Sequence, residues 1–232
     1  MKRLLNVMRI HTTHGEWLWM WPLAVLLVTF LFNVVIITLA GGFDNGSDHS
    51  TGGLVSTYIF TAIGQVQSIT QLFSFAVGLS VTRRAFYIAT SIVVLVQSAV
   101  FGLLLTVLKL IEQATGGWGV RLAFFRFFVL TQDGLLAQWA AYTVPFIGLS
   151  SIAIALAAVF KRWGQAGVVV TGLSIGIVIS AAVAVITWQN WWLQIGAFFV
   201  NTSTLALQAG YPLVIAALAG GAGWLVLRRA AP

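Results

Sequence analysis

The sequence has no cysteine and very few charged residues. Only 7% of its 232 residues are Asp, Glu, Lys or Arg, whereas 59% are hydrophobic. The absence of cysteine excludes disulfide bridges, a thiol nucleophile and thiolate metal ligands. With so few charges the surface could not keep a water-soluble fold of this size dispersed, whereas a surface in contact with lipid needs no charge. Together with a mean hydropathy of +0.98, this composition predicts an integral membrane protein.

Histidine is scarce, and all three histidines lie outside the long apolar runs. His11 and His14 have the spacing of metal ligands but no nearby third ligand, so we interpret them as interfacial side chains. The segment Gly148–Ser151 resembles an intramembrane serine protease motif, yet no later run supplies a histidine as its base. The sequence also lacks a GxxxxGK[ST] phosphate-binding loop. We therefore predict no catalytic residue, no metal site and no cofactor in this chain.

Six apolar runs are each long enough to cross a hydrocarbon core, which takes about 20 residues per helix. They predict an all-α protein with one six-helix transmembrane domain over residues 17–232, preceded by a lead-in segment of residues 1–16. On a helical wheel the lead-in segment separates Leu4, Leu5 and Met8 from its polar residues, which is typical of an amphipathic helix in the membrane interface. The expected spans are residues 17–40, 54–79, 86–110, 137–160, 166–188 and 208–227.

The basic residues concentrate on one side of these spans, and the chain has a net charge of +7. Since basic residues of short loops stay in the cytoplasm, both termini are expected to be cytoplasmic, in a multi-pass protein of the cell (plasma) membrane. The clusters are too small and too separated for a nucleic-acid surface, so no nucleic-acid partner is expected. Nine basic residues fall on the inner side: Lys2, Arg3, Arg9, Arg83, Arg84, Lys161, Arg162, Arg228 and Arg229. The outer side has Lys109, Arg121 and Arg126.

Two outer segments are too apolar for ordinary loops. Gly117–Leu130 is too short to span, and we expect it to lie in the interface or to dip into the membrane and return. Trp188–Gln208 mixes aromatic side chains with amides and hydroxyls, which is typical of a segment that enters the headgroup layer.

The span interiors lack the Asp, Glu, His and Arg that proton-driven carriers usually hold, and contain amides and hydroxyls instead. In the second span polar and small residues recur at three- and four-residue intervals. Two interpretations stay open: this stripe lines a translocation path, or it packs helices together. If it lines a path, the expected contacts are Asn33, Gln67, Ser68 and Gln71. The stripe consists of Thr57, Thr61, Gly64, Ser68, Gln71, Ser74 and Gly78.

The turn between the second and third spans reads GLSVTRRAFY. A Gly-x-x-x-x-Arg-Arg-x-Phe run at this place, formed by Gly78, Arg83, Arg84 and Phe86, resembles the small permease subunits of ATP-binding cassette transporters of the type-2 exporter class. The basic lead-in helix, the inner termini and the apolar segment before the last span are similar to that family as well. The outer segment Gly117–Gln132 is longer and more aromatic than in a minimal member.

The resemblance implies a permease subunit that dimerises with itself or a paralogue and is powered by separate ATPase subunits, which bind ATP and Mg. It implies that the turn containing Gly78, Thr82, Arg83, Arg84 and Phe86 seats on the ATPase. Arg3 and Arg9 of the lead-in helix would make a second contact with it. The expected activity is export of an amphipathic or hydrophobic compound, such as a drug, an antimicrobial peptide or a lipid.

Other functions stay open at this point. The chain could be an ATP-independent channel or carrier, or a membrane module that senses or holds a peptide without transport. An intramembrane enzyme would need a base or metal cluster, which the sequence lacks. The lipid bilayer is a partner under every alternative.

Overall fold

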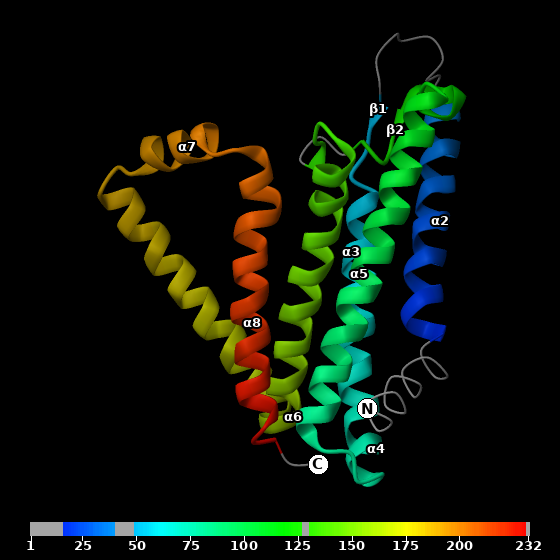
Figure 1. Ribbon diagram of the computed structural model, residues 1–232. Helices are drawn as coiled ribbons and strands as arrows, with labels where there is room; N and C mark the ends of the chain where they lie inside the picture. The colour runs from blue at the N-terminus through cyan, green and yellow to red at the C-terminus, as the bar shows by residue number, and fades with distance from the viewer. Residues whose placement is uncertain (1–15, 40–48, 127–129, 231–232) are drawn as a thin grey trace.

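The computed structural model describes residues 16–39, 49–126 and 130–230, and Figure 1 shows that helices dominate them. The predicted lead-in helix, with Arg3 and Arg9, lies outside these residues. The helices are α2 (Glu16–Leu39), α3 (Leu54–Gln67), α4 (Phe73–Gly78), α5 (Arg83–Ala114), α6 (Leu135–Trp188), α7 (Trp192–Asn201) and α8 (Tyr211–Leu227). Shorter elements are the π-helical segments η1 (Ser68–Leu72) and η4 (Ala206–Gly210), the turn η2 (Gly117–Arg121), whose backbone has positive φ at four of its five residues, and the strands β1 (His49–Ser50) and β2 (Leu122–Ala123).

Long apolar helices make this a membrane protein. Within the described ranges, four helices are long and apolar enough to cross a bilayer: Leu18–Leu39, Arg83–Ala114, Leu135–Trp188 and Ala206–Leu227. A bilayer core offers backbone groups no water, so segments of this kind satisfy their N–H and C=O groups within the helix. The expectation of a helical membrane protein is confirmed at this level.

Two predicted spans correspond to one helix that is sharply bent. Gly164 has φ 67° and ψ −159°, a conformation that is almost restricted to glycine, inside α6. The bend divides α6 into a first arm, residues 135–163, and a second arm, residues 165–188, which diverge in Figure 1. The predicted second span corresponds in turn to three consecutive elements, α3, η1 and α4, which run without a break over residues 54–78.

The packed part of the molecule is formed by α2, α3, α5, the first arm of α6 and α8. Close approach depends on small residues: a Cβ added to Gly102 of α5 would lie 2.0 Å from Oγ1 of Thr143, and one added to Gly223 of α8 would lie 3.2 Å from Cα of Ala155. One apolar cluster, around Phe101 and Tyr142, fills the half of the packed region away from the α4–α5 turn, and a second fills the half next to that turn.

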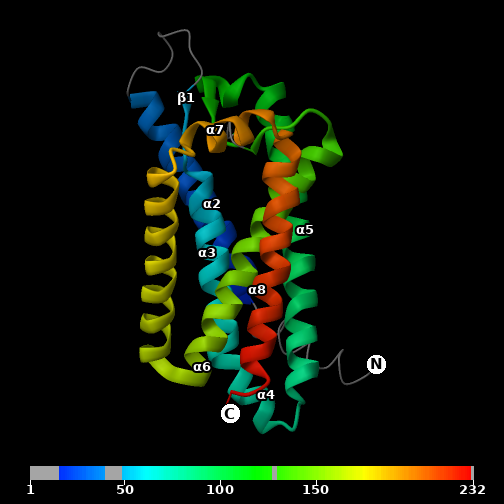
Figure 2. The ribbon, with the colours of Figure 1, turned by 90° about the vertical axis from the view of Figure 1, so that its left-hand side faces the viewer.

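The second arm of α6 and α7 lie apart from this packed region. None of the side chains of α7 is buried, and the apolar side chains of the second arm are largely exposed. Figure 2 shows α7 passing from the end of the second arm toward the top of α8. The predicted segment Trp188–Gln208 therefore contains a short helix, α7, that joins two long ones.

Candidate functional site

The turn between α4 and α5 is short and held by backbone hydrogen bonds. The N–H of Val81 donates to the carbonyl of Ala76 at 3.0 Å, and the N–H of Ser80 donates to that of Val77 at 3.0 Å. Thr82 is the N-cap of α5, and its hydroxyl oxygen accepts from the N–H of Ala85 at 3.3 Å. Such a cap satisfies one of the free N–H groups at a helix start. The resulting turn has little freedom to move independently of the helices it joins.

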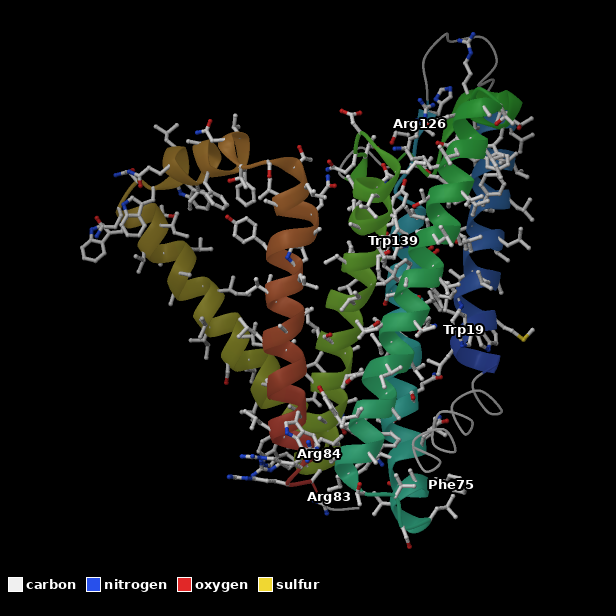
Figure 3. All side chains as sticks on the ribbon, in the orientation of Figure 1. Trp19, Phe75, Arg83, Arg84, Arg126 and Trp139 are labelled. Atoms are coloured by element: carbon white, nitrogen blue, oxygen red, sulfur yellow. The ribbon has the colours of Figure 1, made fainter. Side chains whose placement is uncertain are left out.

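The two arginines of the turn have different environments. Arg83 Nη1 donates to the carbonyl of Arg228 at 2.9 Å, so Arg83 fastens the start of α5 to the end of α8. Arg84 is exposed. Figure 3 places both at the end of the molecule opposite Arg126. Nearby, Lys161 Nζ donates to Oγ of Ser74 at 2.9 Å, which links the first arm of α6 to α4.

The other two residues of the resemblance differ in burial. Phe86 is fully buried and makes an edge-to-face contact with Phe73, with ring centroids 5.4 Å apart. It therefore anchors the turn in the core and is not presented to a partner's surface. Gly78 is exposed, and a Cβ added there would meet nothing within 4 Å. The structure gives no steric reason for a glycine at this position.

The predicted path residues do not come together. Gln67 and Gln71 are exposed on the outside of the packed region. Ser68 is buried, and its hydroxyl has no hydrogen-bond partner among the described residues. Asn33 is half-buried, and its Nδ2 donates to the carbonyl of Thr29 at 2.8 Å within α2.

The amides that do meet are Gln65 and Gln97. Gln65 Nε2 donates to Oε1 of Gln97 at 2.7 Å, and Gln97 Nε2 donates to the carbonyl of Leu18. Both glutamines are 1% exposed, so this pair links α3, α5 and α2 within the packed region. The sequence contains the signal, an amide in each of two neighbouring spans, but does not show which amides face each other. This contact shows buried amides holding helices together, although neither glutamine belongs to the polar stripe of the second span.

The end of the molecule opposite the α4–α5 turn contains a carboxylate whose contacts the sequence does not reveal. Glu112 is fully buried, and its Oε2 accepts from the N–H groups of Phe124 at 2.9 Å and Phe125 at 2.8 Å. Its Oε1 accepts from the N–H of Arg126 at 3.0 Å and lies 3.4 Å from Nε of the same residue. Trp118 Nε1 also donates to Oε2, at 3.3 Å. The carboxylate therefore holds Trp118 and residues 124–126 of the segment after α5 together.

The backbone of this outer segment explains its glycines. Gly117 has φ +83°, and a Cβ there would lie 2.8 Å from the N of Leu122. The following strand β2 pairs in parallel with β1, with His49 opposite Leu122. Gly117–Leu130 was expected to lie in the interface or to dip and return. Its described part folds over the ends of α2, α3 and α5 that lie opposite the α4–α5 turn, with Phe124 and Phe125 in the core.

These contacts anchor the α4–α5 turn to α8 and to the core, and the segment after α5 to Glu112. Within the part of the chain that the structure describes, no group of three or more His, Asp or Glu side chains could hold a metal ion. Comparisons with protein-family models, with curated proteins and with solved structures give no match.

Proposed function

We propose that this chain is the membrane-spanning permease subunit of an ATP-binding cassette transporter that exports an amphipathic or hydrophobic compound. The chain would cross the membrane six times: α2, the α3–η1–α4 stack, α5, the two arms of α6, and η4 with α8. The end of the molecule that carries Arg83, Arg84, Lys161 and Arg228, here called the basic end, would face the cytoplasm. Both termini would be cytoplasmic as well. Separate ATPase subunits would bind ATP and Mg and supply the driving force.

One observation carries this proposal: the turn at the basic end is tied to several helices at once. Thr82 caps α5, Arg83 donates to the carbonyl of Arg228 at the end of α8, and Phe86 fixes the turn in the core. A displacement of the turn would therefore move α4, α5 and α8 together, which is the mechanical requirement for coupling to an external motor. Arg84 is exposed at the same place and can bond a carboxylate of a partner.

The exposed second arm of α6 is consistent with a second copy or a paralogue. Its side chains include Leu173, Ile177 and Val178, which are 63%, 70% and 67% exposed. These apolar side chains require either lipid or another protein surface. In a dimer the substrate would pass between the two copies, and the exposed amides Gln67 and Gln71 would be accessible to it.

The test starts with purification in mild detergent and identification of any nucleotide-binding protein that accompanies the chain. The complex is then reconstituted in liposomes, where ATP hydrolysis and release of a fluorescent hydrophobic cation are measured together. We expect Arg84→Ala to reduce transport per ATP hydrolysed severalfold. Arg229→Ala, an exposed arginine outside the turn, is the matched control and should leave this ratio unchanged.

The alternatives give different results in the same liposomes. An ATP-independent channel or carrier would move the probe with the purified chain alone, which would refute the proposal. A sensing or immunity module would bind an ATPase and a peptide yet transport nothing. Equal coupling ratios for Arg84→Ala and the wild type would reduce the turn to a topological anchor.

A further inference from the structure

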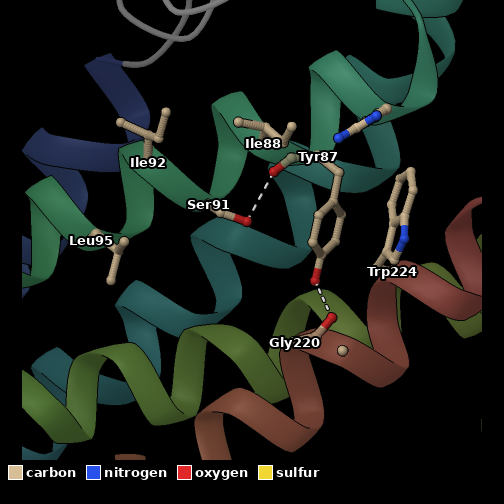
Figure 4. A pocket seen from close by; sticks show the side chains of 9 residues that line it. Tyr87, Ile88, Ser91, Ile92, Leu95, Gly220 and Trp224 are labelled. Atoms are coloured by element: carbon tan, nitrogen blue, oxygen red, sulfur yellow. Dashed lines mark hydrogen bonds between the residues drawn. The ribbon is translucent and has the colours of Figure 1, made fainter.

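A lateral groove lies between α5 and α8 at the basic end of the molecule. It has a volume of about 650 Å³, within the usual range of ligand sites, about 300–1,000 Å³. Both helices pack against the first arm of α6, and Tyr87 of α5 bridges them by donating its hydroxyl to the carbonyl of Gly220. Figure 4 shows this bridge and the apolar side chains along α5 beside it.

One wall of the groove is an apolar face of α5 that begins at an arginine. Arg84, Ile88, Ser91, Ile92 and Leu95 all line the groove, and their spacing places them on one side of the helix. The single hydroxyl among them is satisfied internally, because Ser91 Oγ donates to the carbonyl of Tyr87 at 2.9 Å. The wall is therefore apolar along its length, with a cationic group at one end.

The opposite wall is α8, which contributes two glycines and, nearer the basic end, a tryptophan. Gly220 and Gly221 line the groove there, and a Cβ added to Gly221 would meet nothing within 4 Å. Trp224 lies near the basic end, with its ring 5.4 Å from that of Tyr87. Aromatic side chains of this kind are typical of the headgroup level of a bilayer.

The length of the groove matches the thickness of the hydrocarbon layer of one leaflet. From Arg84 to Leu95 is eleven residues, or about 16 Å along a helix. Half of a hydrocarbon core is about 15 Å. The groove has a guanidinium at the headgroup level, an aromatic pair beside it and an apolar stretch of this length. These features match a molecule with an anionic head and a long hydrocarbon chain.

We propose that this groove binds one anionic phospholipid from the leaflet on the basic side. The lipid phosphate would bind the guanidinium of Arg84, which makes no hydrogen bond or ion pair with any other described residue. One acyl chain would lie along Ile88, Ile92 and Leu95 and against the glycines of α8. The site does not depend on the transport function proposed above, because it requires neither ATP nor a partner.

The experiment measures lipid binding to the full-length chain in detergent. The purified, delipidated protein is titrated with phosphatidylglycerol or with phosphatidylcholine, and bound lipid is counted by native mass spectrometry. We expect the first phosphatidylglycerol to bind about tenfold more tightly than phosphatidylcholine. Both lipids offer Arg84 a phosphate, but only phosphatidylglycerol has a net negative charge, because the choline ammonium offsets the phosphate charge of phosphatidylcholine. Arg84→Gln should remove this preference, because phosphatidylglycerol then loses more affinity than phosphatidylcholine.

Two further variants, Gly221→Leu and Ile92→Trp, narrow the apolar part of the groove. Gly221→Leu should weaken binding of both lipids, whereas Gly176→Leu, at another helical glycine with open space around its Cβ position, should change neither. If Gly221→Leu does not insert, Ile92→Trp narrows the same part of the groove from α5. Equal affinities for the two lipids in the wild type, or phosphatidylglycerol binding that neither blocking variant weakens, would overturn the proposal.

Discussion

The carboxylate of Glu112 gives the sharpest prediction, because so many donors converge on it. Three backbone N–H groups, of Phe124, Phe125 and Arg126, donate to its two oxygens at 2.8 to 3.0 Å. In Glu112→Gln one of these oxygens becomes an NH₂ group, which cannot accept. At least one buried N–H then lacks an acceptor, and the remaining bonds lose their charge assistance.

The size of the effect follows from these contacts. An unsatisfied buried donor costs about 1–3 kcal/mol, and hydrogen bonds to charged groups contribute about 1.5–3 kcal/mol against about 1 for neutral ones. The Arg126 ion pair adds little, since its side chain is 30% exposed. We therefore expect opening of the segment after α5 to become easier by about 3 kcal/mol, or roughly a hundredfold in the opening equilibrium.

Amide hydrogen exchange with mass spectrometry measures this opening directly. The peptide covering residues 117–126 should exchange roughly a hundredfold faster in Glu112→Gln than in the wild type, while peptides from the middle of α5 stay unchanged. Asp133→Asn, at an exposed carboxylate near the same end, is the matched control. Exchange of the 117–126 peptide within about twofold of the wild type would refute the reasoning about the carboxylate.

Two further predictions concern the packed region. Gly102→Ala should lower the melting temperature in detergent, because its Cβ would lie 2.0 Å from Oγ1 of Thr143, whereas Gly172→Ala has open space and should leave it unchanged or raise it. Gln97→Leu should destabilise by about 1–2 kcal/mol, since it leaves Gln65 buried without its partner. The double change of both glutamines to leucine should cost less than the sum of the single changes in thermal unfolding, and additive costs would show that the pair does not interact.

The positions of the long helices could be predicted from the sequence to a large extent, because apolar length is a local property. The expected spans 17–40 and 86–110 correspond to α2 (Glu16–Leu39) and α5 (Arg83–Ala114), although α5 extends further at both ends. The extension at the start of the helix arises from Thr82 and Arg83, which cap and fasten it. Membrane sidedness and the number of crossings stay predictions.

The side-chain contacts could not be predicted, since they depend on which helix faces which. The sequence shows amides in the second and third spans, but the pairing of Gln65 with Gln97 requires the rotation of both helices about their axes. That rotation also turns Gln67 and Gln71 outward. The contacts of Glu112 could not be predicted either. Its partners lie up to 14 residues further along the chain, and residues with positive φ between them decide how the chain turns back.

Helix α5 links two of these contacts, because Arg83 stands at its start and Glu112 near its end. Arg83 at its start is fastened to α8, and Glu112 near its end holds the outer segment, 29 residues or about 44 Å away. Every residue between them is α-helical, whereas the neighbouring α3–η1–α4 stack contains a π-helical turn at Ser68–Leu72. Because π turns locally weaken the regular hydrogen-bond ladder, the α3–η1–α4 segment would deform before α5 does. A movement imposed on the basic turn would therefore reach the outer end along α5, with the α3–η1–α4 stack yielding beside it.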